Sequence, residues 1–193
     1  MKLKTEEIKD IAISSAALTF IFSYPYFLQD PLVLAVYAVA IVTGFVFHEL
    51  AHRAAANKFG AYAAFRLWPQ GLYLAIILAV ITNGNFIFAA PGAVVISNLR
   101  FGRFGVSPLG RREMGIISAA GPVTNVLLAA IFAALHAFSG FDLFLYAASV
   151  NITLALFNMI PIPPLDGSKI LNWDLKVWSA TAAIILMFRV FVV

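Results

Sequence analysis

The sequence predicts an all-α polytopic membrane protein with about six transmembrane helices, and three observations support this fold class. First, 62% of the 193 residues are hydrophobic and 11% are charged, whereas soluble domains are about 45–50% apolar and about 25% charged. Second, the mean hydropathy is +0.93. Third, long apolar runs recur along the chain, separated by short charged segments. We therefore expect a single membrane-embedded domain over residues 1–193, without a soluble appendage.

Five of the apolar runs are suited to one membrane-spanning helix each, because a span needs about 20 mainly apolar residues. They are Ile11–Leu28, Pro31–Phe47, Met114–Phe141, Leu143–Leu165 and Leu175–Val193, the last of which contains Arg189 near its end. The first run lacks a small-residue cleavage site, so we interpret it as a membrane helix rather than a signal peptide.

The apolar run from Leu67 to Leu99 is long for a single span and contains a turn signal near its middle. The tetrapeptide TNGN at Thr82–Asn85 includes Asn-Gly, which is typical of tight turns. The following segment, Phe86–Ser97, is rich in β-branched and aromatic residues. We expect a re-entrant unit or a small membrane-associated β-hairpin or sheet here, which would form a wall of a site.

Basic residues predict the orientation of the helices. Lys2, Lys4 and Lys9 indicate a cytoplasmic N-terminus. Further basic residues place the ends of the second and third runs on that same side: Arg53, Lys58, Arg66, Arg100, Arg103, Arg111 and Arg112. The loop at 100–113 is expected to contact lipid head groups. Because the net charge of +4 is distributed over short clusters, no nucleic-acid partner is expected.

A candidate metal site follows the second apolar run, where His48, Glu49 and His52 form the pattern H-E-x-x-H. On a helix, two histidines four residues apart face the same way and can bind one Zn²⁺. Glu49 lies beside them and can take a proton from a water molecule. Ionisable residues at membrane depth are costly and usually functional. The alternative is a solvated, interfacial helix end without a catalytic role.

A catalytic zinc site requires three protein ligands and one open position, and the chain has no cysteine. The candidates on other segments are His136, Asp142, Asp166 and Asp174. The predicted topology places His136 and Asp142 on the opposite side of the membrane, and Asp166 on the side of the histidines. Prolines exclude a regular helix before Asp166, and Gly167 permits a tight turn after it. A plain interfacial loop is the alternative interpretation.

Two asparagines are further candidates for the site. Asn158 precedes Asp166 by eight residues, and its amide could donate to a developing oxyanion or, alternatively, cap the fifth helix. Gly121 and Pro122 allow a close helix approach and free a backbone carbonyl. Asn125, one turn further on, could bond across to the helix that carries the histidines, or serve in packing alone.

Taken together, these motifs resemble those of the site-2 protease family of intramembrane zinc metalloproteases. H-E-L-A-H at 48–52 and N-x-x-P-x-x-P-L-D-G at 158–167 are similar to its two signatures, and A-A-G-P-V-T-N at 119–125 resembles a third feature. The resemblance covers the family's catalytic core, here about residues 31–170. It implies one zinc ion per chain bound by His48, His52 and Asp166, with Glu49 as general base. It further implies that Asn158 holds the substrate or stabilises the oxyanion.

The chain also departs from the family pattern. It has no room for the PDZ or CBS domain that many members carry, and Pro163 is an additional proline in the second signature. The family often forms a membrane-associated β-sheet between the first signature and the Gly-Pro helix, and the Leu67–Leu99 run occupies that place. It is longer and more apolar than a simple hairpin.

We therefore expect a multi-pass membrane endopeptidase that cuts transmembrane helices of other proteins near the cytoplasmic face. Its partners would be transmembrane protein substrates and the lipid bilayer. The substrate must be extended, because a helix engages its own carbonyl groups in hydrogen bonds. A strand at Phe86–Ser97 could bind it by strand addition. The expected substrate-binding residues are Asn125, Phe86, Val94 and Val95.

Two other functions compete with a peptidase for this sequence. A catalytically inactive scaffold that binds transmembrane helices would lack a metal ligand or the base, and here both histidines, the glutamate and the aspartate are present. A metal transporter or zinc sensor would line both halves of the membrane with polar groups, whereas here the ionisable groups gather at one face. Both observations favour the peptidase.

Overall fold

The computed structural model describes residues 4–102 and 105–192, and this part of the chain is mainly helical. The helices are α1 (Thr5–Ser23), α2 (Leu32–Lys58), α3 (Pro69–Ile81), α4 (Arg111–Ser139), α5 (Asp142–Asn158), α6 (Asp166–Trp173) and α7 (Leu175–Phe191), with a 3₁₀ turn η1 (Tyr26–Leu28). The strands are β1 (Ala61–Leu67), β2 (Gly92–Gly102) and β3 (Gly105–Pro108). Lys2 of the basic N-terminus and Arg103 of the basic loop lie outside the described residues.

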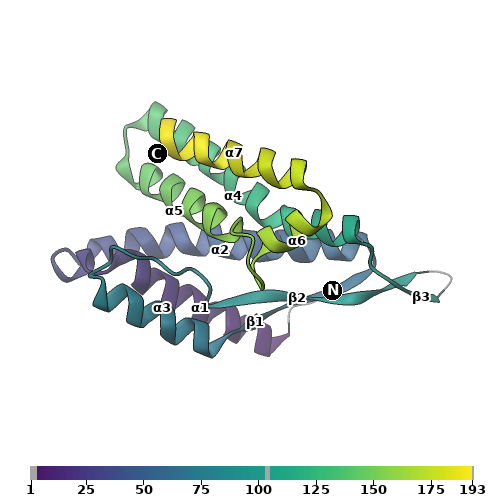
Figure 1. The fold of residues 1–193 in the computed structure, drawn as a ribbon. Helices are drawn as coiled ribbons and strands as arrows, with labels where there is room; N and C mark the ends of the chain where they lie inside the picture. Colours follow the sequence, from purple (N-terminus) through teal and green to yellow (C-terminus); the bar gives the residue numbers. More distant parts are fainter. Residues whose placement is uncertain (1–3, 103–104, 193) are drawn as a thin grey trace.

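Helix α2 runs through the middle of the molecule and separates two groups of elements (Figure 1). On one side lie α4, α5, α6 and α7, and on the other lie α1, α3 and the sheet. One buried apolar cluster, with Leu18, Ile41 and Phe65, joins α1, α2, α3 and the sheet to the facing sides of α4 and α5, and a second, with Ile152 and Ile170, lies among α4, α5, α6 and α7. Because α2 contacts both groups, a side chain on α2 can meet residues from distant parts of the sequence.

Local signals in the sequence explain several helix boundaries. Helix α4 begins where the Glu113 carboxylate accepts the backbone N–H of Gly110, and it ends at Gly140, which adopts a left-handed conformation. Asp174 caps α7 by accepting the backbone N–H groups of Lys176 and Val177. Helix α5 stops at Asn158, three residues before the first of three prolines.

The sheet is antiparallel with the order β1-β2-β3. Strand β1 pairs along β2 from Gly92 to Arg100, whereas β3 pairs only with its last part, from Leu99 to Gly102. Among the described residues, no strand therefore pairs with the second edge of β2 over residues 92–98. The outer edge of β1 is covered by α1, because Glu7 accepts the N–H of Phe65 and Asp10 accepts that of Leu67.

The run from Leu67 to Leu99 folds as helix α3, a turn and an extended return into β2, so the predicted turn and a strand in the second half are both present. The turn falls at the predicted Asn-Gly pair, since Asn83 and Gly84 have φ angles of 52° and 77°. Helix α3 has 13 residues and is about 20 Å long at about 1.5 Å per residue, which is shorter than a hydrocarbon layer of about 30 Å. A single crossing by α3 is therefore disfavoured.

The strand predicted at Phe86–Ser97 is wrong at its N-terminal end. Residues 86–90 form no regular element, and β2 begins at Gly92. Pro91 cannot donate a hydrogen bond, which explains why the ladder begins after it. Strand β1, which was not predicted, supplies the partner of β2.

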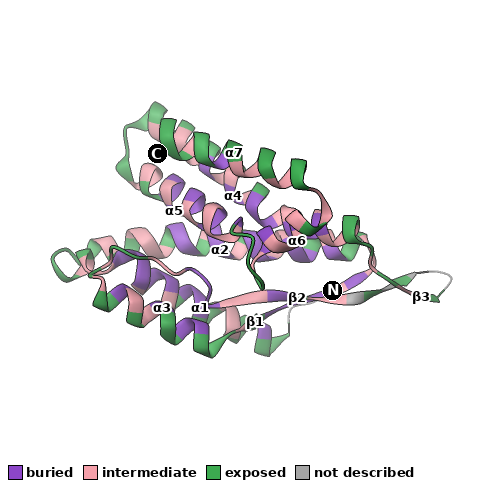
Figure 2. Ribbon diagram, in the orientation of Figure 1, coloured by how far each residue is buried: buried purple, intermediate pink, exposed green. Residues whose placement is uncertain are grey.

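Two helices, α2 and α4, are long and apolar enough to cross a membrane, and α3 and α5 are shorter apolar helices. The predicted count of about six transmembrane helices is not confirmed. Large apolar side chains cover the outer faces of the described helices, among them Phe138, which is 91% exposed, and exposed residues lie on the outward sides of the ribbon (Figure 2). Extended apolar surface of this kind indicates contact with a membrane or a partner rather than with water.

Candidate metal centre

Helix α2 carries His48, Glu49 and His52, and all three side chains are buried. The two histidines are one helical turn apart and point to the same side of α2. The imidazole rings are nearly perpendicular, with their centroids 4.6 Å apart. The helix continues for six residues beyond His52, so the motif lies within a regular helix rather than at its end.

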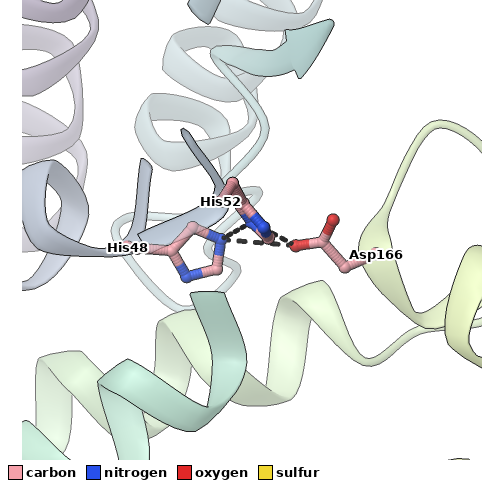
Figure 3. A group of neighbouring side chains, drawn as sticks. All are labelled: His48, His52 and Asp166. Atoms are coloured by element: carbon pink, nitrogen blue, oxygen red, sulfur yellow. Dashed lines mark hydrogen bonds and ion pairs between the residues drawn. The ribbon is translucent and has the colours of Figure 1, made fainter. Parts of the chain in front are cut away.

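Asp166 reaches the histidines from the first turn of α6 (Figure 3). Its Oδ2 atom lies 2.9 Å from His52 Nε2 and 3.3 Å from His48 Nε2, and the two Nε2 atoms are 3.0 Å apart. Gly167 allows this approach, because a Cβ atom there would collide with the backbone carbonyl of Met159. The prolines and the glycine of this segment thus bring a carboxylate to residues more than 110 positions earlier in the chain.

The outer nitrogen of each imidazole is held by a hydrogen-bond acceptor. His52 Nδ1 donates to the backbone carbonyl of Ile117, at 2.8 Å, and His48 Nδ1 donates to Asn125 Oδ1. The orientation of the Asn125 amide is fixed, because its Nδ2 donates to Gly44 O and to Asn151 Oδ1. Both Nδ1 atoms therefore carry the proton in the neutral rings, and both Nε2 atoms present lone pairs to Asp166.

The spacing of the donor atoms of these three residues fits a zinc ion. Two lone pairs and a carboxylate oxygen that converge to 2.9–3.3 Å repel one another unless a cation lies between them. Tetrahedral zinc with bonds of about 2.0–2.1 Å keeps its ligands about 3.3 Å apart, which is close to the observed spacing. The donor set of two imidazoles and one carboxylate leaves a fourth position open.

Space around the three donors is tightly limited. Gly121 on α4 faces the rings directly, and a Cβ atom at this position would collide with the Nε2 atoms of both His48 and His52. The open space at the centre is about 20 Å³, which is room for about one water molecule. Its lining includes Glu49, whose Oε2 atom is buried without a hydrogen-bond partner among the described residues. A buried carboxylate oxygen left free at such a place is available to accept a proton from a bound water.

The charge state of Asp166 suits a metal ligand, since metal binding requires a deprotonated carboxylate. Burial alone would raise the pKa of Asp166, but when the His52 and His48 rings carry a second proton, their charge and hydrogen bonds outweigh burial and hold the pKa of this carboxyl group well below its usual range. Lys169, one turn along α6, places its Nζ 3.7 Å from the other carboxylate oxygen, Oδ1. Asp166 thus turns one oxygen to the histidines and the other to a cation.

Of the remaining predicted site residues, some line the open space at the metal centre and others do not. Asn158 and Val94 line the space at the centre, although Asn158 Nδ2 also donates to Leu154 O within α5. Val95 is exposed on β2, and Phe86 is exposed in the segment before it. Asn125 is fully buried behind His48, so its contacts assign it to the support of this ring. A direct contact of Asn125 with substrate stays an untested prediction.

Three features of the site were missed by sequence reasoning. The carbonyl of Ile117 has no side-chain signal, so its bond to His52 could not be anticipated. Asn151, which supports Asn125, did have a signal, because an amide within the apolar run 143–165 is costly unless it is bonded. The third is an ion pair next to His52, formed by Arg53 and Glu7.

Two imidazoles and a carboxylate around a small open space, with the Glu49 carboxylate beside them, define a metal-dependent hydrolase centre of the H-E-x-x-H class. Comparisons with known proteins agree with this class. The profile of peptidase family M50 matches residues 135–185, which include Asp166. A protein of Methanocaldococcus jannaschii named "Putative zinc metalloprotease" is 42% identical over 183 residues, which cover 92% of this chain and 90% of the relative.

A second relative, from Bacillus subtilis and also named "Putative zinc metalloprotease", is 33% identical over 169 residues and is matched over 72% of its length. No solved structure matches the chain. With these similarities, the chain belongs to peptidase family M50, the membrane-embedded site-2 protease family. Zinc is accordingly its metal, and protease activity is the function that the family indicates.

Proposed function

We propose that the protein is an intramembrane zinc endopeptidase that hydrolyses peptide bonds in or near transmembrane helices of other proteins. The observation that carries the proposal is the position of the metal centre on α2, a helix that is long and apolar enough to cross a membrane. A peptidase for soluble substrates has no need of a catalytic centre on an apolar helix of this length. Polar catalytic groups on such a helix are costly, and their position suits a substrate that itself lies in the membrane.

The proposed roles of the residues follow from their positions. His48, His52 and Asp166 would hold the zinc ion. When bound, zinc polarises the carbonyl group of the scissile bond and the attacking water. Glu49, whose Oε2 atom has no hydrogen-bond partner among the described residues, accepts a proton from that water as the water oxygen forms a bond to the carbonyl carbon. Glu49 then gives the proton to the departing amine as the C–N bond breaks.

Asn158 and β2 are proposed to hold the substrate. Asn158 uses one amide hydrogen for Leu154 O, which leaves the second N–H for a substrate carbonyl or an oxyanion. The edge of β2 that has no partner strand among the described residues begins at Gly92, and Gly92, Ala93 and Val94 line the centre. An extended substrate could pair with this edge by strand addition, which would present its peptide bond to the centre.

The membrane arrangement is part of the proposal. The two candidate spans and the apolar outer faces support integration in the bilayer. We propose a multi-pass arrangement with a cytoplasmic N-terminus, and a centre near the cytoplasmic face, on the basis of the basic residues that flank the apolar runs. The catalytic core would be about residues 31–170 within one domain over residues 1–193.

The first experiment measures zinc by mass spectrometry in detergent-purified wild type, Asp166→Ala and Glu49→Gln, together with cleavage of β-casein as an unstructured probe. We expect about one zinc per chain in wild type and Glu49→Gln, much less in Asp166→Ala, and cleavage only by wild type. Equal zinc in Asp166→Ala would remove Asp166 from the ligands. Cleavage retained in Glu49→Gln would exclude Glu49 as the base, and zinc without any cleavage would favour an inactive scaffold.

Membrane substrates require a second step. The protein is incorporated into vesicles with model transmembrane segments, and the cleavage positions are mapped by mass spectrometry. Cleavage within or next to the apolar segment is expected. Cleavage confined to residues far outside the bilayer would contradict the intramembrane proposal while leaving the peptidase activity intact.

A further inference from the structure

An apolar cavity of about 340 Å³ lies directly beside the metal centre. One wall is the irregular segment before β2, and the other is the end of α5 with the proline-rich loop that leads to α6. The two walls touch where the rings of Phe88 and Phe157 meet edge to face, with centroids 5.3 Å apart. The lining residues are Trp68, Phe86, Phe88, Ala90, Phe157, Ile160, Ile162, Pro163, Pro164 and Leu165.

The cavity lies next to the open space at the metal centre. Pro164 and Leu165 line both of them. On one side the wall of the cavity continues from Ala90 into Gly92, and on the other from Phe157 into Asn158. The same two chain segments therefore border both spaces, of which one contains the metal ligands and the other is the apolar cavity.

Size and chemistry distinguish the two spaces. The centre itself has room for about one water molecule, so a substrate side chain beside the scissile bond must be placed elsewhere. The residues that line the cavity are apolar apart from the indole N–H of Trp68, and none carries a charge, so a charged side chain would have no ion-pair partner among them. A large apolar side chain fills such a space and loses no hydrogen bond.

We infer that this cavity is a subsite for a large apolar side chain, such as leucine, methionine or phenylalanine, of the substrate residue next to the scissile bond. The inference rests on the proposed peptidase function and names the residues that determine specificity. An extended substrate places every second side chain on the same face. Because the cavity begins where β2 begins, a substrate paired with the free edge of β2 can insert one side chain into it.

The test uses dipeptide hydroxamates, which bind through the metal and need no cleavage. Their affinities for zinc-loaded, detergent-purified protein are measured by calorimetry for methyl, isobutyl and benzyl side chains. In wild type, the benzyl compound should bind at least about tenfold tighter than the methyl compound, since hydrophobic pockets discriminate by about 10–200-fold. The preference should not depend on detergent concentration.

Two variants change the cavity in opposite directions. Ala90 is nearly buried and lines the cavity, so the phenyl group of Ala90→Phe would occupy that space and remove the preference for the benzyl compound. Ile162 is 60% exposed, so Ile162→Ala should fold and shift the preference towards a larger naphthyl group. Ile77→Ala, at an isoleucine of α3 that is 54% exposed and outside the cavity, is the matched control.

The outcomes separate this inference from the proposed function. Equal affinities for the three compounds in wild type, or a preference that is unchanged in both cavity variants, would show that the cavity does not bind a substrate side chain. Lipid or detergent would then be its occupant. Cleavage of β-casein by wild type would still support the peptidase in that case. If wild type cleaves neither β-casein nor the model transmembrane segments, the proposed function is overturned. The assignment of the cavity to a substrate side chain then falls with it.

Discussion

The carboxylate of Glu7 on α1 forms a buried ion pair with the guanidinium of Arg53, the residue that follows His52 on α2. The Nη1 atom of Arg53 lies 2.6 Å from both Glu7 oxygens, and both side chains are nearly inaccessible to solvent. Glu7 also accepts the backbone N–H of Phe65 on β1. A single carboxylate thus connects the first helix, the helix of the metal centre and the edge of the sheet.

Removal of this carboxylate should destabilise the protein. Glu7→Leu removes the carboxylate that compensates the buried Arg53 charge, and breaking a buried pair of this kind costs about 3–5 kcal/mol. Urea unfolding in detergent, monitored by circular dichroism, measures the change. The double variant Glu7→Leu/Arg53→Leu should recover part of the loss, because apolar replacement of both partners is often tolerated. Glu6→Leu, at the exposed pair with Lys9, is the control and should change little; an equal loss there would contradict the argument.

The Glu7–Arg53 ion pair is a feature of the fold that could not be predicted from the sequence. Hydropathy indicated the apolar helices, and the Asn-Gly pair located the turn after α3, because both signals are local. Glu7 and Arg53 are 46 positions apart, and each taken alone looks like an ordinary charge at a helix end. Strand β1 was missed for a similar reason, since its pairing with β2 depends on residues about 30 positions away.

Gly121 should be essential for metal binding. A methyl group at this position would occupy the space of the His48 and His52 Nε2 atoms, so the rings must move apart. We expect Gly121→Ala to lose most of its zinc, as measured by mass spectrometry on the folded, monodisperse fraction. Gly115→Ala is the matched control, because the same change on the same helix meets the ring of Trp173 instead. It should lower stability yet retain zinc, and full zinc content in Gly121→Ala would refute the prediction.

Asn125 should tune zinc affinity through His48. Asn125→Leu leaves the His48 Nδ1–H without its acceptor, and loss of such a partner typically weakens metal affinity by about 10–100-fold. Competition with a chelator of known affinity measures the change. Asn151→Leu removes only one of the bonds that orient Asn125, so its effect should be smaller. Wild-type affinity in Asn125→Leu would show that the contact does not matter for the metal.

The metal ligands could be predicted from the sequence more readily than the residues that position them. The spacing of His48 and His52 places them on one helix face by helical geometry alone. Asp166 lies 114 positions after His52, and residue types and predicted topology made it a candidate that the family resemblance then selected. The backbone carbonyl of Ile117 and the closeness of Gly121 to the rings depend on how α2 and α4 pack, which no local pattern encodes.

The pairing register of β1 and β2 identifies which backbone N–H groups of β2 point away from β1. Phe65 and Leu67 direct their N–H groups away from β2, to Glu7 and Asp10. In an antiparallel ladder, the residues opposite them, Val94 and Gly92, then direct their own N–H and C=O groups away from β1. The Val94 N–H therefore points to the edge without a partner strand, beside the metal centre.

Val94→Pro should accordingly slow substrate cleavage without removing zinc. Proline deletes an N–H that takes no part in the ladder with β1, so the sheet can persist, while a substrate strand loses one hydrogen bond. A bond worth about 0.5–1.5 kcal/mol corresponds to a fall of about 2- to 12-fold in kcat/KM. Val94→Thr keeps both the N–H and the side-chain shape and is the control. Cleavage of β-casein at equal rates by the two variants, both loaded with zinc, would exclude strand addition at this edge.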